Sequence, residues 1–255
     1  MVEMKMAGGA SARGRLKKLG VIGGLGPAAS AHFYRRVTEL TDAATDQQHL
    51  EVALLSIPQT PDRTAFLSGA SDVSFVPVLN GAARQLESLG CEVLCVTCVT
   101  AHSLFDQVFG GLESAHALHM PREAARAACA AGCSKVGIMA TDGTARTGVL
   151  QRAIEAEGLA ACLPSREYQQ LVMSLIYDDV KMGKAPDMAK FESVCSHLRD
   201  CGCDGIILGC TELSLIDTPS DFEGMAVIDA MEALAVCAVR TCGARVREEA
   251  VNRAF

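Results

Sequence analysis

Short apolar runs alternate along the chain with longer segments in which apolar and polar residues recur at helical spacing. The apolar runs are too short for helices, so they predict buried strands at residues 19–24, 51–57, 135–140 and 226–228. The amphipathic segments predict helices at residues 28–43, 73–89, 101–108, 123–131, 146–157, 169–182, 188–200 and 231–241. Strands that alternate with helices indicate right-handed βαβ units, so the expected fold class is α/β with parallel sheets.

Two further stretches, residues 90–100 and 202–212, share one pattern. Each begins with Gly-Cys, continues with an acidic residue and an apolar run, and carries a further cysteine seven residues after the first. The apolar runs predict buried strands of a parallel sheet, each delivering this further cysteine where the strand gives way to a loop. Because open α/β sheets bind ligands at the carboxyl ends of their strands, we predict that Cys98 and Cys210 face each other across one site.

The second half of the chain repeats the order of the first. The strand at 135–140 runs into a polar turn, as the opening strand runs into the Gly-rich turn 23–27, and each half closes with a Gly-Cys stretch. We therefore expect two pseudo-symmetric, three-layer α/β domains with the active site in the cleft between them. The expected first domain holds residues 19–115 and 223–255, the second holds residues 116–222, and residues 1–18 form a disordered basic tail.

The composition narrows the class of protein. Of 255 residues, 49% are hydrophobic and only 4% are aromatic, which suits a core of aliphatic side chains. A net charge of −7 argues against a nucleic-acid partner. No run of about 18 apolar residues occurs, so we expect no membrane span. Twelve cysteines without a secretory signal favour a reducing compartment, so we expect a cytoplasmic protein. The basic tail leaves organelle targeting open.

Paired cysteines without a cofactor motif suit proton transfer at a carbon acid. One thiolate removes a proton and the other thiol returns one on the opposite face, which inverts a stereocentre. We expect the helix that follows each strand to lower the thiol pKa from roughly 8.5. Such a site also needs donors that hold a carboxylate and stabilise a developing carbanion. The backbone of residues 23–26 and the hydroxyls of Thr100 and Thr211 are the candidates.

Three other interpretations are weaker. Cys95 and Cys98 form a C-x-x-C pattern, but Cys95 lies inside the apolar run and is expected to be buried and inert. A metal held by Cys98, His102 and Cys210 would have three ligands, and nothing else supports it. Residues 24–29 match a dinucleotide fingerprint, but the second strand lacks the acidic residue at its end that would bind the ribose. We therefore expect neither a cofactor nor a metal.

Six segments together carry a resemblance to a known family: residues 23–27, 58–64, 98–102, 140–144, 177–183 and 209–213. From about Leu19 to Leu234 the chain resembles the aspartate/glutamate racemase superfamily, and more closely its aspartate racemase branch. The resemblance implies a racemase independent of pyridoxal phosphate, with Cys98 and Cys210 as acid and base. It implies that Arg63 and Lys181 bind the side-chain carboxylate of the substrate. It also implies a homodimer.

The same resemblance implies further substrate-binding residues: Gly24, Leu25, Gln59, Val99, Thr100, Gln169, Thr211 and Glu212. The glycine turn and the two threonines would hold the α-amino-acid end. Glu212 is equally well read as a site acid or as a residue in the first turn of the following helix. Glutamate racemases of cell-wall synthesis have a histidine at that position and an Asp-Ser opening that this chain lacks. The aspartate branch therefore fits better.

One departure bears on the substrate. The residue after the first cysteine is usually asparagine in the family, where it helps to bind the α-carboxylate end, and it is Val99 here. We expect racemisation of aspartate first and of glutamate second. The alternatives are a related cofactor-free decarboxylase or isomerase of another dicarboxylic acid, or a non-catalytic amino-acid-binding protein of the same fold. Val99 favours the first of these alternatives.

Overall fold

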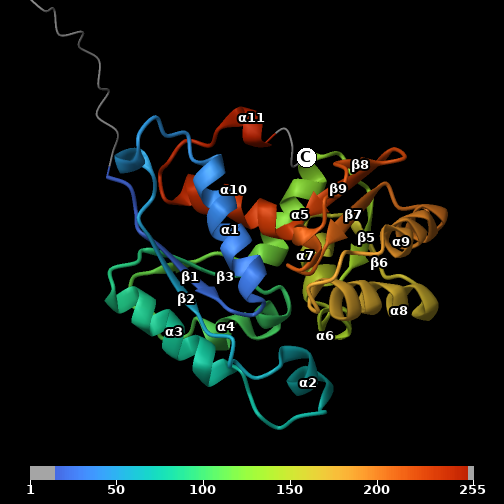
Figure 1. Cartoon of the computed structure of the whole chain (residues 1–255), viewed down its shortest axis with the longest axis horizontal. Helices are drawn as coiled ribbons and strands as arrows, with labels where there is room; N and C mark the ends of the chain where they lie inside the picture. Colours follow the sequence, from blue (N-terminus) through green and yellow to red (C-terminus); the bar gives the residue numbers. More distant parts are fainter. Residues whose placement is uncertain (1–14, 252–255) are drawn as a thin grey trace, which may run out of the picture.

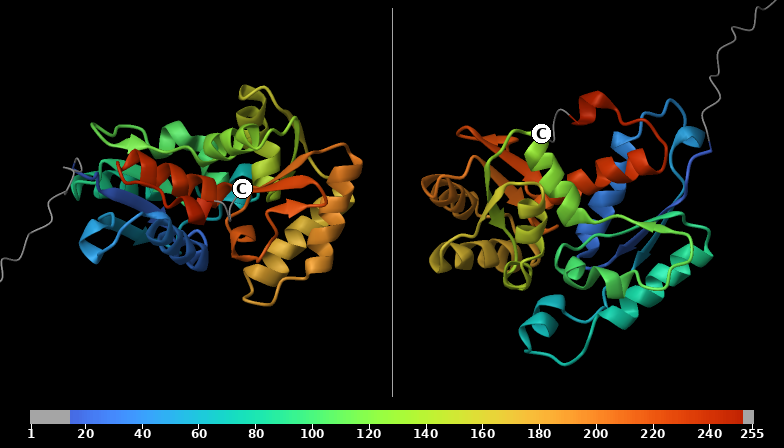
Figure 2. Two further views of the ribbon diagram at one scale, coloured as in Figure 1. Left: turned by 90° about the horizontal axis from the view of Figure 1, so that it is seen from above. Right: turned by 180° about the vertical axis from the view of Figure 1, so that it is seen from behind.

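The protein consists of two β-sheets, built mainly of parallel strands, that lie side by side and are each flanked by helices (Figure 1). The structure is a computed structural model that describes residues 15–251. The predicted fold class, two α/β halves built on parallel sheets, is confirmed. The first sheet and the second sheet occupy opposite ends of the molecule when it is seen from above (Figure 2).

The first sheet has the strand order β2-β1-β3-β4, and all its pairs are parallel. Its strands are β1 (Leu19–Gly23), β2 (Val52–Ser56), β3 (Val93–Val96) and β4 (His116–Ala117). The second sheet has the order β6-β5-β7-β9-β8. Its strands are β5 (Lys135–Met139), β6 (Ala160–Cys162), β7 (Gly205–Leu208), β8 (Asp221–Phe222) and β9 (Met225–Asp229), and only β8 runs antiparallel to its neighbour. The first four strands of each order correspond, which is the repeat seen in the sequence.

Strand pairing departs from the expected division of the chain at two places. Strand β4 pairs with β3 in the first sheet, although we assigned residues from 116 onward to the second domain. Strand β9 pairs with β7 in the second sheet, although we assigned residues 223–255 to the first domain. The helix after β9 then crosses back and packs against helices of both halves (Figure 1). The exact division into domains stays a prediction.

The α-helices are α1 (Pro27–Leu40), α2 (Arg63–Ser68), α3 (Val76–Ser88), α4 (Phe105–Val108), α5 (Met120–Ala130), α6 (Asp142–Thr147), α7 (Val149–Ala156), α8 (Arg166–Ser174), α9 (Met188–Asp200), α10 (Ala230–Thr241) and α11 (Glu248–Val251). Three 3₁₀ turns, η1 (Asp46–Gln48), η2 (Thr100–Leu104) and η4 (Leu213–Leu215), and the π-helical segment η3 (Leu175–Val180) complete the described chain. The helix α1 begins at Pro27. Proline is tolerated in the first helical turn because the N–H that it lacks would have no partner within the helix there.

The side chains of each central strand alternate between two apolar clusters. In β1, Val21 belongs to the cluster shared with α1, α5 and α10, whereas Ile22 packs toward α3. In β7, Ile207 joins that same shared cluster, whereas Ile206 packs toward α8 and α9. Helices α1, α10, α5 and α7 therefore share one apolar layer between the two sheets. This continuous layer sets the two carboxyl edges, and hence the two cysteine loops, against each other.

Three predicted helices differ from the structure. The helix expected at 146–157 is broken at Gly148, whose φ of 66° ends α6 and begins α7. The helix expected at 169–182 leaves α-helical geometry after Ser174 and continues as η3. The segment 101–108 begins as the 3₁₀ turn η2 rather than as an α-helix.

The beginning of the described chain is ordered, contrary to our expectation for residues 15–18. The Lys17 N–H donates to the Cys242 carbonyl at 2.9 Å, and Lys18 Nζ lies 2.7 Å from a Glu51 carboxylate oxygen. The remainder of the expected tail, residues 1–14, lies outside the described residues. Within residues 15–251, every helix is too short or too polar to cross a membrane.

Candidate active site

Cys98 and Cys210 line one small cavity at the junction of the two halves. Cys98 comes two residues after β3 and Cys210 two residues after β7, at corresponding positions of the two sheets. Each cysteine is only 7% exposed. The sequence prediction that the two strand ends deliver their cysteines to the same place therefore agrees with the geometry. Their chemical roles stay predictions.

Most of the other expected substrate-binding residues line the same cavity. They are Leu25, Arg63, Val99, Thr100, Lys181, Thr211 and Glu212. The cavity volume is about 20 Å³, which is room for roughly one water molecule. An amino acid cannot enter a space of this size. The arrangement is therefore a closed one, and a ligand requires the walls to separate.

Three expected residues do not reach the cavity. The backbone N–H of Gly24 donates to Ser30 Oγ at 2.9 Å, and a Cβ on Gly24 would lie 2.3 Å from the Ile57 nitrogen. This glycine is therefore required by close backbone packing. Gln59 is exposed outside the cavity. The amide of Gln169 donates to the Ala140 carbonyl and to Asp142 Oδ1, each at 2.9 Å, which joins α8 to the turn before α6.

Four residues line the cavity that our sequence analysis did not name as site residues: Asp62, Thr64, Thr141 and Tyr177. All four lie within the segments that carried the family resemblance, so the signal was present in the sequence. What the sequence lacked was the direction of each side chain. Asp62 also caps α2 by accepting a hydrogen bond from the Ala65 N–H at 2.7 Å, and this cap fixes the start of the helix that carries Arg63.

Glu212 connects a cysteine and a lysine inside the site. The Cys210 thiol donates to Glu212 Oε2 at 2.9 Å, and Lys181 Nζ lies 2.6 Å from Glu212 Oε1. Glu212 is 4% exposed, and 28% of the Lys181 side chain is exposed. Of the two interpretations that the sequence left open for Glu212, its contacts favour a site acid. Glu212 is the residue immediately before the η4 turn.

The Cys210 thiol is held in its protonated form. Burial raises the pKa of Cys210 well above its ordinary value, and the neighbouring Glu212 carboxylate raises it further, whereas Lys181 lowers it. This is opposite to our expectation that a helix N-terminus would lower the pKa of the site thiols. The element after Cys210 is only the short η4 turn, so its dipole does not offset the burial of the thiol.

Arg63 presents its guanidinium to the cavity from the start of α2. Its terminal nitrogens donate to the carbonyls of Pro61 and Leu25, at 3.1 and 3.3 Å. Among the described residues, its buried Nε has no hydrogen-bond partner. Burial alone would lower the pKa of Arg63, but the neighbouring sulfur of Cys98 and carboxylate of Glu212 raise it above its ordinary value. The group therefore carries a positive charge beside Cys98.

Hydroxyl groups join the two halves across the cavity. Thr100 Oγ1, from the first half, lies 2.8 Å from Thr144 Oγ1 and 3.2 Å from Thr141 Oγ1, both from the second half. A Cβ added to Gly143 would lie 2.8 Å from Thr64 Oγ1, so α2 and α6 also approach each other closely here. These contacts form only when the halves are together, and they therefore stabilise the closed arrangement.

His102 holds the backbone of Cys98 from behind. Its Nδ1 lies 2.8 Å from the Cys98 carbonyl oxygen, and its Nε2 accepts a hydrogen bond from the Met120 N–H at 3.1 Å. This pairing makes Nδ1 the protonated nitrogen of a neutral ring, and burial lowers the pKa of His102 to about 3. Because both ring nitrogens are occupied, His102 is not available as a metal ligand in this arrangement.

The fold and the cysteine pair together define a class of two-halved α/β enzymes with one site between the halves. Residues 22–238 match the Asp/Glu/Hydantoin racemase family, and this chain belongs to that family. Membership of this family identifies the protein as an amino-acid racemase.

Solved structures of similar proteins have the same architecture. An aspartate racemase from Picrophilus torridus is 27% identical, covering 94% of this chain and 100% of that chain, with a TM-score of 0.79. An aspartate racemase homologue from Pyrococcus horikoshii is 23% identical over 89% of this chain and 99% of that chain, with a TM-score of 0.73. A glutamate racemase from Bacillus anthracis is 17% identical, covering 88% of this chain and 81% of that chain, with a TM-score of 0.61. The last two show the fold alone.

Proposed function

We propose that this protein racemises an acidic amino acid, aspartate first and glutamate second, without a cofactor. In the proposed reaction the thiols of Cys98 and Cys210 exchange protons with Cα from opposite faces. The observation that carries the proposal is that both cysteines, from corresponding strand ends of the two halves, line one closed cavity. The similarity to the aspartate racemase of Picrophilus torridus supports aspartate as the first substrate to test.

The two thiols have different surroundings, and we assign their proposed roles accordingly. Cys210 donates its S–H to Glu212, whereas Cys98 lies beside the positive charge of Arg63. A Cys98 thiolate would take the Cα proton, and the Cys210 thiol would give its proton to the opposite face. The products are the other enantiomer, a Cys98 thiol and a Cys210 thiolate beside Lys181. The reverse reaction begins from that second state.

Two cations are proposed to bind the side-chain carboxylate of the substrate. The unpartnered Nε of Arg63 favours this role, because a buried donor is normally satisfied by a hydrogen bond. Lys181 is already paired with Glu212, so the substrate carboxylate would share or replace that partner. Both cations border the cavity that contains the cysteines. A substrate with a second carboxylate therefore fits better than a neutral amino acid.

Val99 favours a second candidate, a cofactor-free decarboxylase or isomerase of another dicarboxylic acid. Val99 lines the cavity and is 2% exposed, so an apolar side chain stands where the family usually has an asparagine. A valine cannot donate a hydrogen bond to an α-carboxylate or accept one from an α-amino group. A substrate with fewer polar groups at that end would suit it.

Proton NMR in D₂O separates these candidates. L- and D-aspartate, and then L- and D-glutamate, are incubated with the enzyme and a reductant. Racemisation predicts loss of the Cα–H signal together with appearance of the opposite enantiomer on a chiral column. Exchange with neither amino acid would overturn the proposed substrates, and other dicarboxylic acids would then be screened for decarboxylation or isomerisation.

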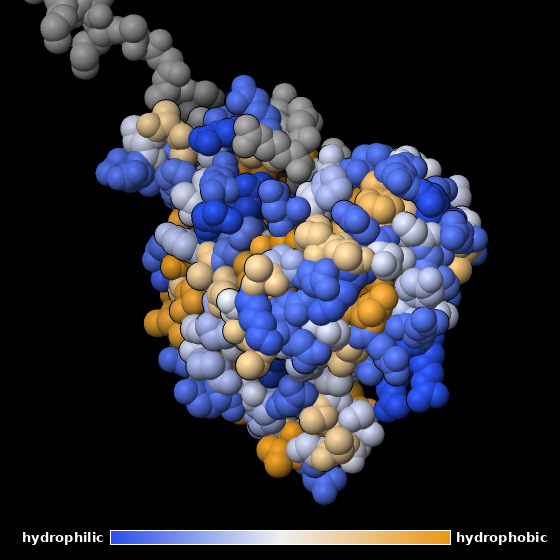
Figure 3. Space-filling model, turned by 45° about the vertical axis from the view of Figure 1, so that its right-hand side comes forward, coloured by the Kyte–Doolittle hydropathy of each residue, from blue (hydrophilic) through white to orange (hydrophobic). Residues whose placement is uncertain are grey.

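The homodimer and the cytoplasmic location stay predictions. The exposed large apolar side chains of the described residues, Tyr34, Val73, Leu89, Leu163 and Met182, lie on separate parts of the chain. On the face shown in Figure 3, hydrophilic residues predominate among the coloured residues and hydrophobic ones form scattered patches. Light scattering combined with size-exclusion chromatography measures the mass in solution directly. A monomer mass at micromolar concentration would contradict the homodimer.

A further inference from the structure

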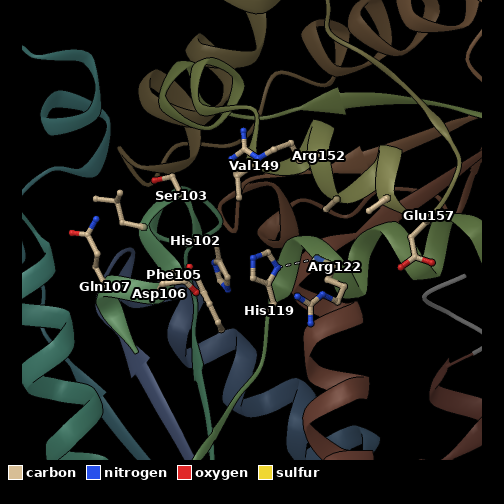
Figure 4. A pocket seen from close by; sticks show the side chains of 13 residues that line it. His102, Ser103, Phe105, Asp106, Gln107, His119, Arg122, Val149, Arg152 and Glu157 are labelled. Atoms are coloured by element: carbon tan, nitrogen blue, oxygen red, sulfur yellow. Dashed lines mark hydrogen bonds between the residues drawn. The ribbon is translucent and has the colours of Figure 1, made fainter. Parts of the chain in front are cut away.

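A second and much larger cavity opens where the turn after Cys98 meets the second half of the molecule (Figure 4). Its volume is about 510 Å³, within the range of roughly 300–1,000 Å³ that small-molecule sites usually have. We call it the junction pocket, and its charged and ring-bearing polar side chains are His102, Asp106, His119, Arg122, Arg152 and Glu157.

The junction pocket has walls from both halves. One wall is η2 and α4, which follow the β3 strand of the first sheet, and the other is formed by α5 and α7, which pack against each other. A ligand in this pocket would touch both walls at once. It would therefore respond to any change in their separation, including the separation that substrate entry requires.

The junction pocket presents two arginines, Arg122 and Arg152, whose guanidinium groups have no close carboxylate partner among the described residues. Within residues 15–251, no carboxylate lies within 4 Å of the charged nitrogens of Arg122 or Arg152. Among the described residues, the guanidinium of Arg152 donates one hydrogen bond, to the Thr147 carbonyl at 2.7 Å. Glu157 is already paired with Arg126, at 3.5 Å. The lining therefore holds two arginines and two acids, Asp106 and Glu157, and Arg126 is shared by Glu157 and Glu123. The two arginines without a carboxylate partner, rather than a net positive charge, mark the pocket as an anion site.

His119 adds an oriented neutral donor. Its Nδ1 accepts the Arg122 N–H at 3.3 Å, the contact drawn as a dashed line in Figure 4. Burial lowers the pKa of His119 to about 4, so the ring is neutral near pH 7 and its proton resides on Nε2. Among the described residues that Nε2 has no hydrogen-bond partner. The ring stands 5.1 Å from that of His102, so the two histidines form a common floor.

The pocket is connected to the active site by two short paths. His102 on its floor bonds to the Cys98 carbonyl and accepts the first N–H of α5, the helix that carries Arg122. On the other wall, α7 with Arg152 follows α6, whose Thr144 hydroxyl lies 2.8 Å from that of Thr100 in the active site. Along the chain, Arg122 is two residues from Met120, and Arg152 is eight residues from Thr144.

We propose that the junction pocket is a second binding site, for a small organic anion with a phosphate or carboxylate group, and that its occupancy is coupled to opening of the active-site cavity. Arg122 and Arg152 bind the anion from α5 and α7, and His119 donates to it. The binding part is independent of the proposed racemase substrate. The coupling part rests on the proposed function, because it is read out as a change in turnover.

The test measures thermal unfolding of the full chain with inorganic phosphate or citrate, against sodium chloride of equal ionic strength. Saturating phosphate or citrate is expected to raise the Tm of the wild type by about 3 °C. The double variant Arg122→Gln/Arg152→Gln should lose this rise. Arg126→Gln, on the same helix but paired with acids, should keep it. Arg63→Gln, which weakens the active site as an anion site, should also keep it.

The outcomes separate the possibilities. A rise with phosphate alone or citrate alone supports the site and names its ligand chemistry. A rise that survives in the double variant, or that disappears in Arg63→Gln, would place the anion elsewhere and overturn the proposal, as would no rise with either probe. In the coupling arm, the bound probe should change the substrate KM of the wild type at least twofold and leave that of the double variant unchanged. Absence of any turnover would contradict the proposed function but leave the binding result intact.

Discussion

The Cys210 thiol donates a hydrogen bond of 2.9 Å to Glu212 Oε2, and the other oxygen of that carboxylate lies 2.6 Å from Lys181 Nζ. A carboxylate beside a thiol disfavours the thiolate, whereas an ammonium group favours it. Glu212 and Lys181 therefore act in opposite directions on the pKa of Cys210. This relationship makes the protonation state of Cys210 depend on one side chain that is simple to change.

Replacing Glu212 by Gln should shift the pH dependence of racemisation to lower pH. The carboxylate raises the pKa of Cys210, and glutamine keeps the hydrogen-bonding shape but removes the charge. The pKa of Cys210 should therefore fall in the variant. The measurement is the pH profile of kcat/KM, with Glu249→Gln at an exposed position as the matched control. An unshifted profile in Glu212→Gln would show that Glu212 does not govern the reacting thiol.

Replacing Lys181 by Met should lower kcat/KM for an acidic substrate by about 10- to 100-fold, the effect of losing one charge-assisted hydrogen bond. Lys181 borders the cavity, and its pKa is raised because Glu212 and Cys210 outweigh the effect of burial. Lys184, which is exposed a few residues further along, provides the control Lys184→Met. Steady-state kinetics on both variants test the assignment. Equal values of kcat/KM for the two variants would show that Lys181 does not bind the substrate.

A third prediction concerns the pH dependence of stability. Asp229 caps α10 and accepts a hydrogen bond from Ser214 Oγ at 2.7 Å. Burial, aided by Glu232, raises the pKa of Asp229 from 3.8 to about 6. Between pH 3.8 and about pH 6 the folded state binds more protons than the unfolded state, so the free energy of unfolding falls as the pH rises. A shift of about two units corresponds to a loss on the order of 3 kcal/mol.

The variant Asp229→Asn lacks this titration. The free energy of unfolding of Asp229→Asn minus that of the wild type should therefore increase from pH 4 to about pH 6 and then level off. Urea unfolding at several pH values measures the difference, and Asp217→Asn, an exposed position, is the control. A difference that stays flat across this range would mean that the Asp229 carboxyl titrates at its ordinary pKa.

Much of the fold was predictable because its determinants are local. The two Gly-Cys stretches are short, apolar and flanked by polar turns, so they indicated β3 and β7 and brought Cys98 and Cys210 to corresponding strand ends. The partner of a strand is not a local property. The apolar pattern of residues 226–228 identifies a strand, but β9 joins the second sheet because an edge beside β7 is free to pair.

Side-chain direction and burial limited the prediction of the site. Gly24 lies in one of the family segments and Gln169 lies outside them, but the polar groups of both bind within the protein, to Ser30 and to Ala140 and Asp142 respectively. The expected lowering of the thiol pKa was wrong for Cys210, because the depth at which a group is buried depends on packing between distant segments. The helix breaks at Gly148. The glycine could be read from the sequence, but a glycine inside a helical pattern does not by itself predict that the helix ends there.

The most direct test of the two-cysteine mechanism is racemisation by the single variants Cys98→Ser and Cys210→Ser. Each is measured with both enantiomers of aspartate by chiral chromatography, with Cys129→Ser, at an exposed cysteine, as the control. Because inversion needs one acid and one base on opposite faces, both variants should lose racemisation by a factor of at least about 1,000, the upper part of the range for general acid–base catalysis. The control should retain wild-type activity. Racemisation at a near wild-type rate in either folded variant would contradict the account.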